Sequence, residues 1–452
     1  VATRLSAFGV EARAVDSVDE GGAQVARIID LSSLSVAHSD EEAIAMQREI
    51  FETVRVVARS TEANRLFIAV TDRDAEATHG AWKGGIAGLL RTLSLEVPEV
   101  ASRFVSIARS SRDAAALAEA IAAEVLTGGV DADIDLDESL VRTAPGFAEA
   151  RAARREDLSP VPADTVLIVS GGARGVTASC LEELAKHGRC RFAILGRTDA
   201  DYAPSWAAGR VMEGDLQQAF IAFEKDAGRM PSPADVRQAV ASVAAAIETR
   251  HSLEALRARG SEVLYLPCDI KDGGDVAMAV STVRAHYGRI DGIVHAAGVL
   301  ADKKIAEKTD AQFASVFDTK VAGLHHLLAA TRNDDLKLLC FFGSVAGRAG
   351  NPGQADYAMA NETLEAVAHA EAAKRPGERV RVLHWGPWDG GMVTPSLRSM
   401  FLQRGVALIP IADGARLFVE ALTHPAAPVS VVIGGRPDAS ALLGSSPSRR
   451  LV

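Results

Sequence analysis

Tyrosine and cysteine are scarce in this sequence. Residues 1–201 contain no tyrosine, and the whole chain of 452 residues has four: Tyr202, Tyr265, Tyr287 and Tyr357. The four cysteines are Cys180, Cys190, Cys268 and Cys340. None of them forms a close pair of the kind that binds metal ions or that marks a disulfide-rich secreted domain. We therefore expect no metal site, and we expect the thiols to be buried in a reducing compartment.

An excess of positive charge is also absent. The formal net charge is −10, which argues against a nucleic-acid-binding surface. No apolar run is long enough to span a bilayer, and no N-terminal pattern resembles a signal peptide. We expect a cytoplasmic protein without nucleic-acid or membrane partners. The chain begins with Val1 instead of Met, so we expect an excised piece of a longer polypeptide.

The length and the 48% content of hydrophobic residues allow two domains with separate cores. In the first part, apolar runs predict strands at 25–31, 65–71 and 103–108. Helical patterns separate them at 40–58, 79–96 and 112–126. Alternating strands and helices indicate a parallel sheet with covered faces.

The second part repeats this alternation more strongly. Its strands are expected at 165–170, 191–196, 262–267, 292–298, 336–343, 379–386 and 429–435. The sequence therefore predicts an α/β fold of two tandem Rossmann-like, doubly wound parallel-sheet subdomains. The expected boundaries are 1–150 and 165–440, with a linker at 151–164. Residues 199–258 form a helical insertion, with an amphipathic helix near 214–228, whose role the sequence leaves open.

A glycine-rich turn, SGGARGVT at 170–177, joins the first strand of the second part to a helix. Such a turn lets backbone amides approach a pyrophosphate at the helix N-terminus. Arg174 within it and Arg197 after the next strand favour the 2′-phosphate of NADPH over the diol of NAD. The full set of predicted cofactor-binding residues is Gly171, Gly172, Arg174, Gly175, Val176, Arg197, Asp269, Ile270, Ala296, Ala297, Gly298 and Pro387.

A candidate catalytic group follows from the chemistry of ketone reduction, which needs an acid for the developing alkoxide. A tyrosine has a pKa of about 10, and a nearby ammonium lowers it. Ser344 ends a predicted strand, Tyr357 lies thirteen residues later, and Asn361 falls one helical turn beyond Tyr357. Lys320 is on the preceding predicted helix. Only Tyr357, among the four tyrosines, has both the serine and the asparagine at these spacings.

These residues resemble the short-chain dehydrogenase/reductase superfamily. Its ordinary members carry Tyr-x-x-x-Lys, whereas this chain has Tyr357 followed four residues later by Asn361. That exchange is similar to the ketoreductase domains of polyketide and fatty acid synthases, in which the lysine comes from the preceding helix, as Lys320 does. The resemblance implies Tyr357 as acid, Ser344 as carbonyl anchor, Lys320 as electrostatic partner and Asn361 as support for proton transfer.

The resemblance extends to the first part, which has no tyrosine and no glycine fingerprint. GAWKGGIAGLLRTLSLEVP at 80–98 is similar to the structural subdomain paired with synthase ketoreductases. This implies a cofactor-free subdomain that supports the catalytic one. Thr177 in place of the third fingerprint glycine and the insertion at 199–258 most resemble the ketoreductases of polyunsaturated fatty acid synthases.

The resemblance also implies a substrate, a 3-ketoacyl thioester on the phosphopantetheine arm of an acyl carrier protein. Other domains of a parent synthase are further expected partners. Residues 389–410 would form a mobile lid, and Arg398 or Arg404 could contact the acidic carrier. Leu300 and Asp302 match a Leu-x-Asp signature for D-configured (3R) alcohols, and Trp388 and Met392 complete the predicted substrate residues.

Two other functions remain open from the sequence. One is a free-standing reductase of a small ketone, which would not need the first 150 residues. The other is a non-catalytic scaffold domain, which would be expected to lack one of the four catalytic residues. The acyl chain length and the neighbouring domains are not determined by the sequence.

Overall fold

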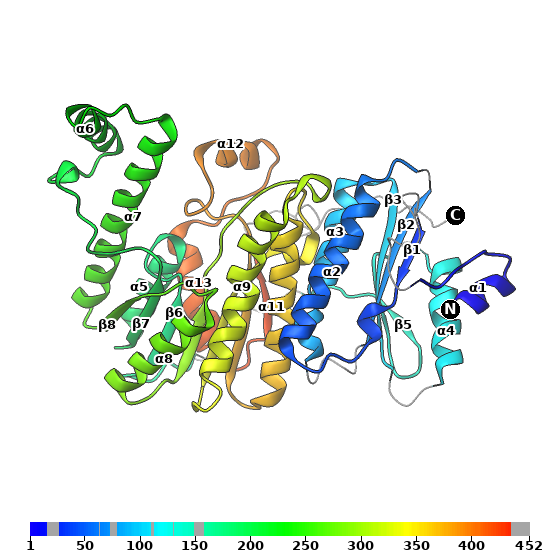
Figure 1. Ribbon diagram of the computed structural model, residues 1–452. Helices are drawn as coiled ribbons and strands as arrows, with labels where there is room; N and C mark the ends of the chain where they lie inside the picture. Colours follow the sequence, from blue (N-terminus) through cyan, green and yellow to red (C-terminus); the bar gives the residue numbers. More distant parts are fainter. Residues whose placement is uncertain are drawn as a thin grey trace.

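The computed structural model describes residues 1–15, 27–62, 64–72, 79–109, 113–129, 131–148 and 158–434. These residues form two α/β units, each built on a largely parallel sheet (Figure 1). The predicted α/β, Rossmann-like fold class is confirmed. Most of the predicted linker, at 151–157, lies outside the described residues, and the predicted subdomain boundaries stay predictions.

The second unit contains a sheet of seven described strands, all parallel, in the order β12-β11-β10-β9-β6-β7-β8. The order reverses between β6 and β9, as in a doubly wound sheet, and ligands of such sheets bind in the crevice outside the carboxyl ends at this point. Each strand starts at most two residues after its predicted start: β6 Val166–Ser170, β7 Arg191–Gly196, β8 Glu262–Pro267, β9 Gly292–His295, β10 Leu338–Ser344, β11 Arg379–Trp385 and β12 Ser430–Ile433.

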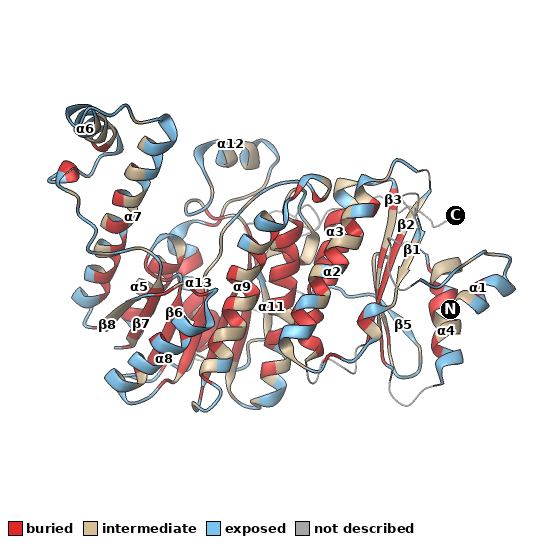
Figure 2. Ribbon diagram, in the orientation of Figure 1, coloured by how far each residue is buried: buried red, intermediate tan, exposed pale blue. Residues whose placement is uncertain are grey.

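Helices cover both faces of this sheet. Along β6, Val166 and Ile168 belong to one apolar cluster, while Leu167 and Val169 belong to another on the opposite face. This explains why β6 reads as a continuous apolar run, and Figure 2 shows β6 and β7 as largely buried strands. The helices are α5 Gly175–His187, α8 Gly273–Tyr287, α9 Asp310–Ala330, α10 Val345–Ala349, α11 Ala355–Lys374, α12 Pro395–Gln403 and α13 Ile411–Thr423.

The first unit has a simpler strand order. Its described strands run β1-β2-β3-β4-β5 in sequence, and β5 is antiparallel to β4. The doubly wound order that we expected of both sheets therefore occurs in the second sheet alone, and the described part of the first has no reversal to form a ligand crevice. The elements are α1 Ala2–Ala7, β1 Arg27–Asp30, α2 Asp40–Arg59, β2 Arg65–Asp72, α3 Ile86–Glu96, β3 Val100–Ile107, α4 Ala114–Thr127, β4 Asp133–Leu136 and β5 Arg142–Thr143.

A close helix pair, α3 and α11, joins the two units. A Cβ atom on Gly88 of α3 would lie 2.6 Å from the carbonyl oxygen of Ala358 in α11. A Cβ atom on Gly85, just before α3, would lie 2.5 Å from the carbonyl oxygen of Met359. The glycines of the 80–98 motif therefore let the first unit approach the backbone of the helix that carries Tyr357.

The insertion at 199–258 is helical, as predicted. It contains a short 3-10 helix at Ser205–Ala207, α6 at Glu213–Asp226 and the long α7 at Pro233–Ala258. A small core formed by Trp206, Leu216, Val240 and other apolar side chains holds these elements together. α6 and the first part of α7 project from the body of the second unit (Figure 1).

Candidate functional site

A cleft of about 1780 Å³ opens at the carboxyl ends of the second sheet. Almost all predicted site residues line it. Two do not: Gly172, whose Cβ would lie 2.5 Å from Val169 Cγ1, and Asn361, which is fully buried. The predicted residues in the lining are Gly171, Arg174, Gly175, Val176, Arg197, Asp269, Ile270, Ala296, Ala297, Gly298, Leu300, Asp302, Lys320, Ser344, Tyr357, Pro387, Trp388 and Met392.

The glycine turn between β6 and α5 is shaped for close backbone approach. Gly171 and Gly175 have φ angles of +74° and +60°, which favour glycine. A Cβ atom on Gly171 would lie 2.9 Å from the backbone of Ala297, which follows β9. The turn also leads into the N-terminus of α5, where backbone amides favour anions. These features fit the diphosphate of a nicotinamide dinucleotide.

Arg174 and Arg197 both line the cleft at this end. Burial raises the pKa of the nearby Tyr265, and the positive charge of Arg174 acts in the opposite direction. The Tyr265 hydroxyl donates a hydrogen bond to the carbonyl of Thr198, at 2.6 Å. Among the described residues neither arginine has an ion pair, so both can face an anionic ligand.

The insertion supplies one wall of the same cleft. The α7 residues that line the cleft recur at helical spacing, and this periodicity is the sequence signal that could have placed the insertion at the cleft. They are Gln238, Ala241, Ser242, Ala245, Glu248 and Thr249. Glu248 Oε1 accepts a hydrogen bond from Gly175 N–H at 2.9 Å. The carboxylate therefore lies at the N-terminus of α5, next to the predicted phosphate-binding turn.

The structure brings three of the predicted catalytic residues together. Ser344 is the last residue of β10, Tyr357 lies in the first turn of α11, and Lys320 lies in α9. The Lys320 Nζ atom is 5.4 Å from the ring centroid of Tyr357 and donates a hydrogen bond to the carbonyl of Phe342 at 2.7 Å. Burial lowers the pKa of Lys320 to about 7, so its charge changes near neutrality.

The pKa of Tyr357 differs from our expectation. We expected Lys320 to lower it, whereas burial raises it, and interactions with Ser344 and Asn361 oppose this only in part. Removing the phenol from water disfavours the charged phenolate. Asn361 Nδ2 donates to the backbone carbonyl of Tyr357 at 2.6 Å, and its buried Oδ1 has no partner among the described residues. Tyr357 is therefore held protonated at neutral pH.

Two further residues position Lys320, and the sequence reasoning missed them. The His295 Nε2–H donates to the backbone carbonyl of Lys320 at 2.9 Å. Its Nδ1 accepts from the hydroxyl of Ser170, at 2.8 Å. Burial, together with the charge of Lys320, lowers the pKa of His295 to about 3, so the ring is neutral. A histidine inside the apolar run GIVHAAG was the available signal.

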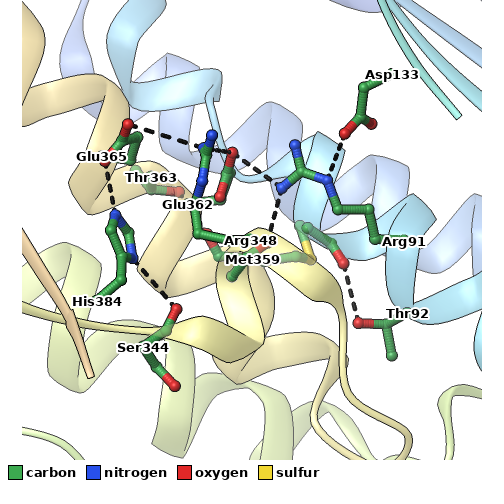
Figure 3. Close-up of polar contacts among 12 residues, drawn as sticks. Arg91, Thr92, Asp133, Ser344, Arg348, Met359, Glu362, Thr363, Glu365 and His384 are labelled. Atoms are coloured by element: carbon green, nitrogen blue, oxygen red, sulfur yellow. Dashed lines mark hydrogen bonds and ion pairs between the residues drawn. The ribbon is translucent and has the colours of Figure 1, made fainter. Parts of the chain in front are cut away.

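A buried histidine of the neighbouring strand β11 also contacts the end of β10 (Figure 3). The fully buried His384 in β11 contacts the backbone carbonyl of Ser344 through Nδ1 at 3.2 Å and the carboxylate of Glu365 through Nε2 at 2.7 Å. His384 thereby links the backbone at Ser344 to a carboxylate on α11. Burial raises the pKa of Glu365, but hydrogen bonds with two histidines and the charge of Arg348 outweigh it and hold this pKa well below its usual range.

This charged cluster continues into the first unit. Arg348 Nη1 lies 2.6 Å from Glu362 Oε1, and Glu362 lies 3.0 Å from Arg91 of α3. Arg91 also binds Asp133 of β4 at 2.6 Å and the carbonyl of Gly347 at 2.7 Å (Figure 3). The first unit thus supports α10, the helix that follows Ser344.

The segment predicted to be a lid includes α12, which has no buried residue. Arg398, one of the two arginines expected to contact a carrier, forms an ion pair with Asp389 at 2.6 Å, so it is not a free cation. Arg404, the other, lines the cleft. Trp388 is buried, and its ring centroid lies 4.7 Å from that of Trp385. Met392, in contrast, is half exposed.

The fold and site define a Rossmann-type oxidoreductase with a serine, a tyrosine and a lysine beside a dinucleotide turn. Residues 165–390 match the KR domain family. The chain belongs to this family of nicotinamide-dependent ketoreductase domains, oxidoreductases that act on a keto group. No helix of the described segments has the length and apolarity needed to cross a membrane, and these segments hold no cluster of three or more potential metal-ligating side chains.

The relatives are parts of multidomain synthases. The chain is 37% identical over 381 residues, 81% of its length, to one subunit of the polyunsaturated fatty acid synthase of Thraustochytrium sp., and spans 13% of that protein. It is 34% identical over 39% of its length to polyketide synthase PksL of Bacillus subtilis, and spans 4% of that protein. The chain thus covers a small part of each relative.

Solved structures show the same fold. An A1-type ketoreductase superposes with a TM-score of 0.72 at 18% identity, over 96% of this chain and 85% of that one. A ketoreductase domain from the bacillaene assembly line superposes with a TM-score of 0.66 at 21% identity, over 94% of each chain.

Proposed function

We propose that this chain reduces a 3-ketoacyl thioester, carried on the phosphopantetheine arm of an acyl carrier protein, to the 3-hydroxyacyl thioester with NADPH. The observation that carries the proposal is the convergence of Ser344, Tyr357 and Lys320 in one cleft with the glycine turn. The small share of the synthase relatives that the chain covers supports a role as one domain of a larger synthase.

The glycine turn and the two arginines Arg174 and Arg197 would hold NADPH, whose nicotinamide would supply a hydride to the keto carbon. The hydroxyl of Ser344 donates a hydrogen bond to the ketone oxygen and fixes its position. Tyr357 transfers its phenol proton to this oxygen as negative charge develops. The Lys320 ammonium stabilises the phenolate that remains, and Asn361 holds the backbone of Tyr357 through its carbonyl and supports proton transfer.

We assign NADPH from Arg174 and Arg197, since both line the cleft after β6 and β7 and neither has an ion pair among the described residues. Arginine accommodates the 2′-phosphate. Asp269 and Ile270 would contact the adenine, and the small residues Ala296, Ala297 and Gly298 would let the cofactor lie against the sheet.

The stereochemical outcome is proposed to be the 3R alcohol. Leu300 and Asp302 line the same cleft as Tyr357, and Gln354 Nε2 donates a hydrogen bond to the Asp302 carboxylate at 3.1 Å. Trp388 and Met392 would contact the acyl chain. The unit within 1–150 would support the catalytic unit without binding cofactor, in a cytoplasmic synthase.

NADPH oxidation measured with a series of 3-ketoacyl thioesters and with trans-1-decalone tests the proposal. We expect turnover with the thioesters and a strong preference for NADPH over NADH. Cofactor binding without turnover of any ketone would favour the scaffold alternative. Preference for NADH would contradict the role of the two arginines.

A further inference from the structure

Two loops meet at the substrate side of the cleft. One, residues 298–309, contains Leu300 and Asp302; the other, residues 350–354, leads into α11 and Tyr357. The backbone N–H of Lys303 donates to the carbonyl of Gly353 at 2.9 Å. The relative position of the two loops therefore sets the spacing between Asp302 and Tyr357.

A residue of the first unit binds both loops. Glu96, the last residue of α3, accepts a hydrogen bond from Ile305 N–H through Oε2 and another from Gly353 N–H through Oε1, each at 2.7 Å. One carboxylate thus satisfies one backbone donor in each loop. A carboxylate accepting two backbone hydrogen bonds is a strong, directional contact.

A buried ion pair adds a second connection, between the first loop and the start of α11. Lys308 is fully buried, and its Nζ donates to Asp356 Oδ2 at 2.7 Å and to the carbonyl of Ala301 at 2.8 Å. The other oxygen of Asp356 accepts from the N–H of Tyr357 at 2.9 Å. The residue before Asp302 is therefore connected to the backbone of Tyr357 through two charged groups.

The charges agree with this arrangement. Burial raises the pKa of Glu96, but its two backbone hydrogen bonds and the positive charge of Lys308 act against this and favour the carboxylate. Burial likewise raises the pKa of Asp356 to about 6, and Lys308 opposes this rise. One buried cation thus pairs with Asp356 and also acts through its charge on Glu96 of the other unit.

We propose that Glu96 is a positioning residue for stereocontrol: by holding both loops, it fixes Asp302 relative to Tyr357 and so determines which face of the ketone receives the hydride. This inference rests on the proposed function. It gives the first unit a role in the selectivity of the reaction beyond support of the fold, because the residue comes from the unit that contains no catalytic tyrosine.

The substitution Glu96→Gln tests this inference. An amide has one acceptor oxygen, so one of the two loop N–H groups would face an NH₂ group instead of an acceptor. We expect the ratio of major to minor alcohol stereoisomer to fall about tenfold and kcat to fall, with the Kd for NADPH unchanged, since a lost charged hydrogen bond corresponds to about a tenfold change. Chiral analysis of the product and cofactor fluorescence provide the readouts.

The control is Glu99→Gln, which makes the same charge change three residues away. Glu99 is exposed and pairs with Arg65 at 3.9 Å, so we expect the stereoisomer ratio of this variant to equal that of the unchanged protein. Should Glu96→Gln fail to fold, Glu96→Asp keeps the charge on a shorter side chain and is expected to shift the ratio by a smaller amount.

A folded Glu96→Gln variant with the same stereoisomer ratio as the unchanged protein would overturn the inference while leaving ketone reduction intact. An unchanged protein that binds NADPH but reduces no ketone would instead overturn the proposed function. The two failures are therefore distinguishable in the same set of assays.

Discussion

Burial changes the two ionisable groups that face each other in the site. It lowers the pKa of Lys320 to about 7 and raises that of Tyr357. Both shifts favour the neutral forms, because charge is disfavoured away from water. At neutral pH the phenol keeps the proton it has to donate, while the lysine is close to losing the charge that would stabilise the phenolate.

This predicts how the reaction depends on pH. As pH rises through about 7, Lys320 becomes neutral, so kcat/KM for ketone reduction should fall between about pH 6 and about pH 9. Lys320→Met should be slower and should lose this fall. A steady-state pH profile of both proteins is the measurement, and a flat profile for the unchanged protein would contradict the assignment.

The identities of these residues could be predicted from the sequence, but their electrostatics could not. The spacing of Ser344 and Tyr357 on adjacent elements indicated the site, and Lys320 followed from the family pattern. The direction of the pKa shift of Tyr357 depends on the depth of its burial, which spacing does not reveal. Ser170 and His295 were missed because their bonds to each other and to Lys320 connect distant parts of the chain.

The position of α7 in the fold could not be predicted from the sequence. The insertion was recognised as helical, but its position along the cofactor side of the cleft depends on tertiary packing. Glu248 at Gly175 N–H places a negative charge beside the turn where the cofactor diphosphate is proposed to bind. Bound cofactor would therefore displace or face this carboxylate.

We predict that Glu248→Gln binds NADPH more tightly, by about threefold, because the side chain is exposed and its repulsion of the phosphates is screened. Titration of cofactor fluorescence measures the Kd. Glu254→Gln, also exposed on α7 but absent from the cleft lining, is the control and should leave the Kd unchanged. Weaker binding by Glu248→Gln would show that the carboxylate assists the cofactor.

The close contact between α3 and α11 leads to a prediction about the stability of the protein. Gly88→Ala would place a methyl group against the backbone of Ala358. We therefore expect the free energy of unfolding to fall by about 1–3 kcal/mol. Activity should also fall, because Tyr357 is next to Ala358 in the chain. Gly214→Ala in α6, where a Cβ meets nothing within 4 Å, should not destabilise the protein. Urea denaturation of both variants tests this, and equal stabilities would contradict the packing.

At the scale of the whole molecule, the sequence predicted two α/β units but not how they combine. Buried side chains from both units, such as Phe51 and Leu93 from one and Met359 and Leu364 from the other, form one continuous apolar cluster. Hydrophobic periodicity shows that a helix has an apolar face without showing what covers it. For the same reason the sequential strand order of the first sheet was not foreseen.

The described residues of the first unit do not line the cleft, but they hold segments that do. Arg91 supports the helix after Ser344, and Glu96 binds the loops next to Asp302 and Tyr357. These contacts agree with the alignment of one relative to both parts of the chain, over 81% of the length of this chain.

The most direct test of the account is the rate of NADPH oxidation with a 3-ketoacyl thioester by the unchanged protein and by Tyr357→Phe, with the Kd for NADPH measured for both. We predict equal cofactor binding and a fall in kcat of at least about 10²-fold for the variant, because the phenylalanine has no proton to donate. A Tyr357→Phe protein that reduces the ketone at the full rate would contradict the central claim that this phenol is the acid of the reaction.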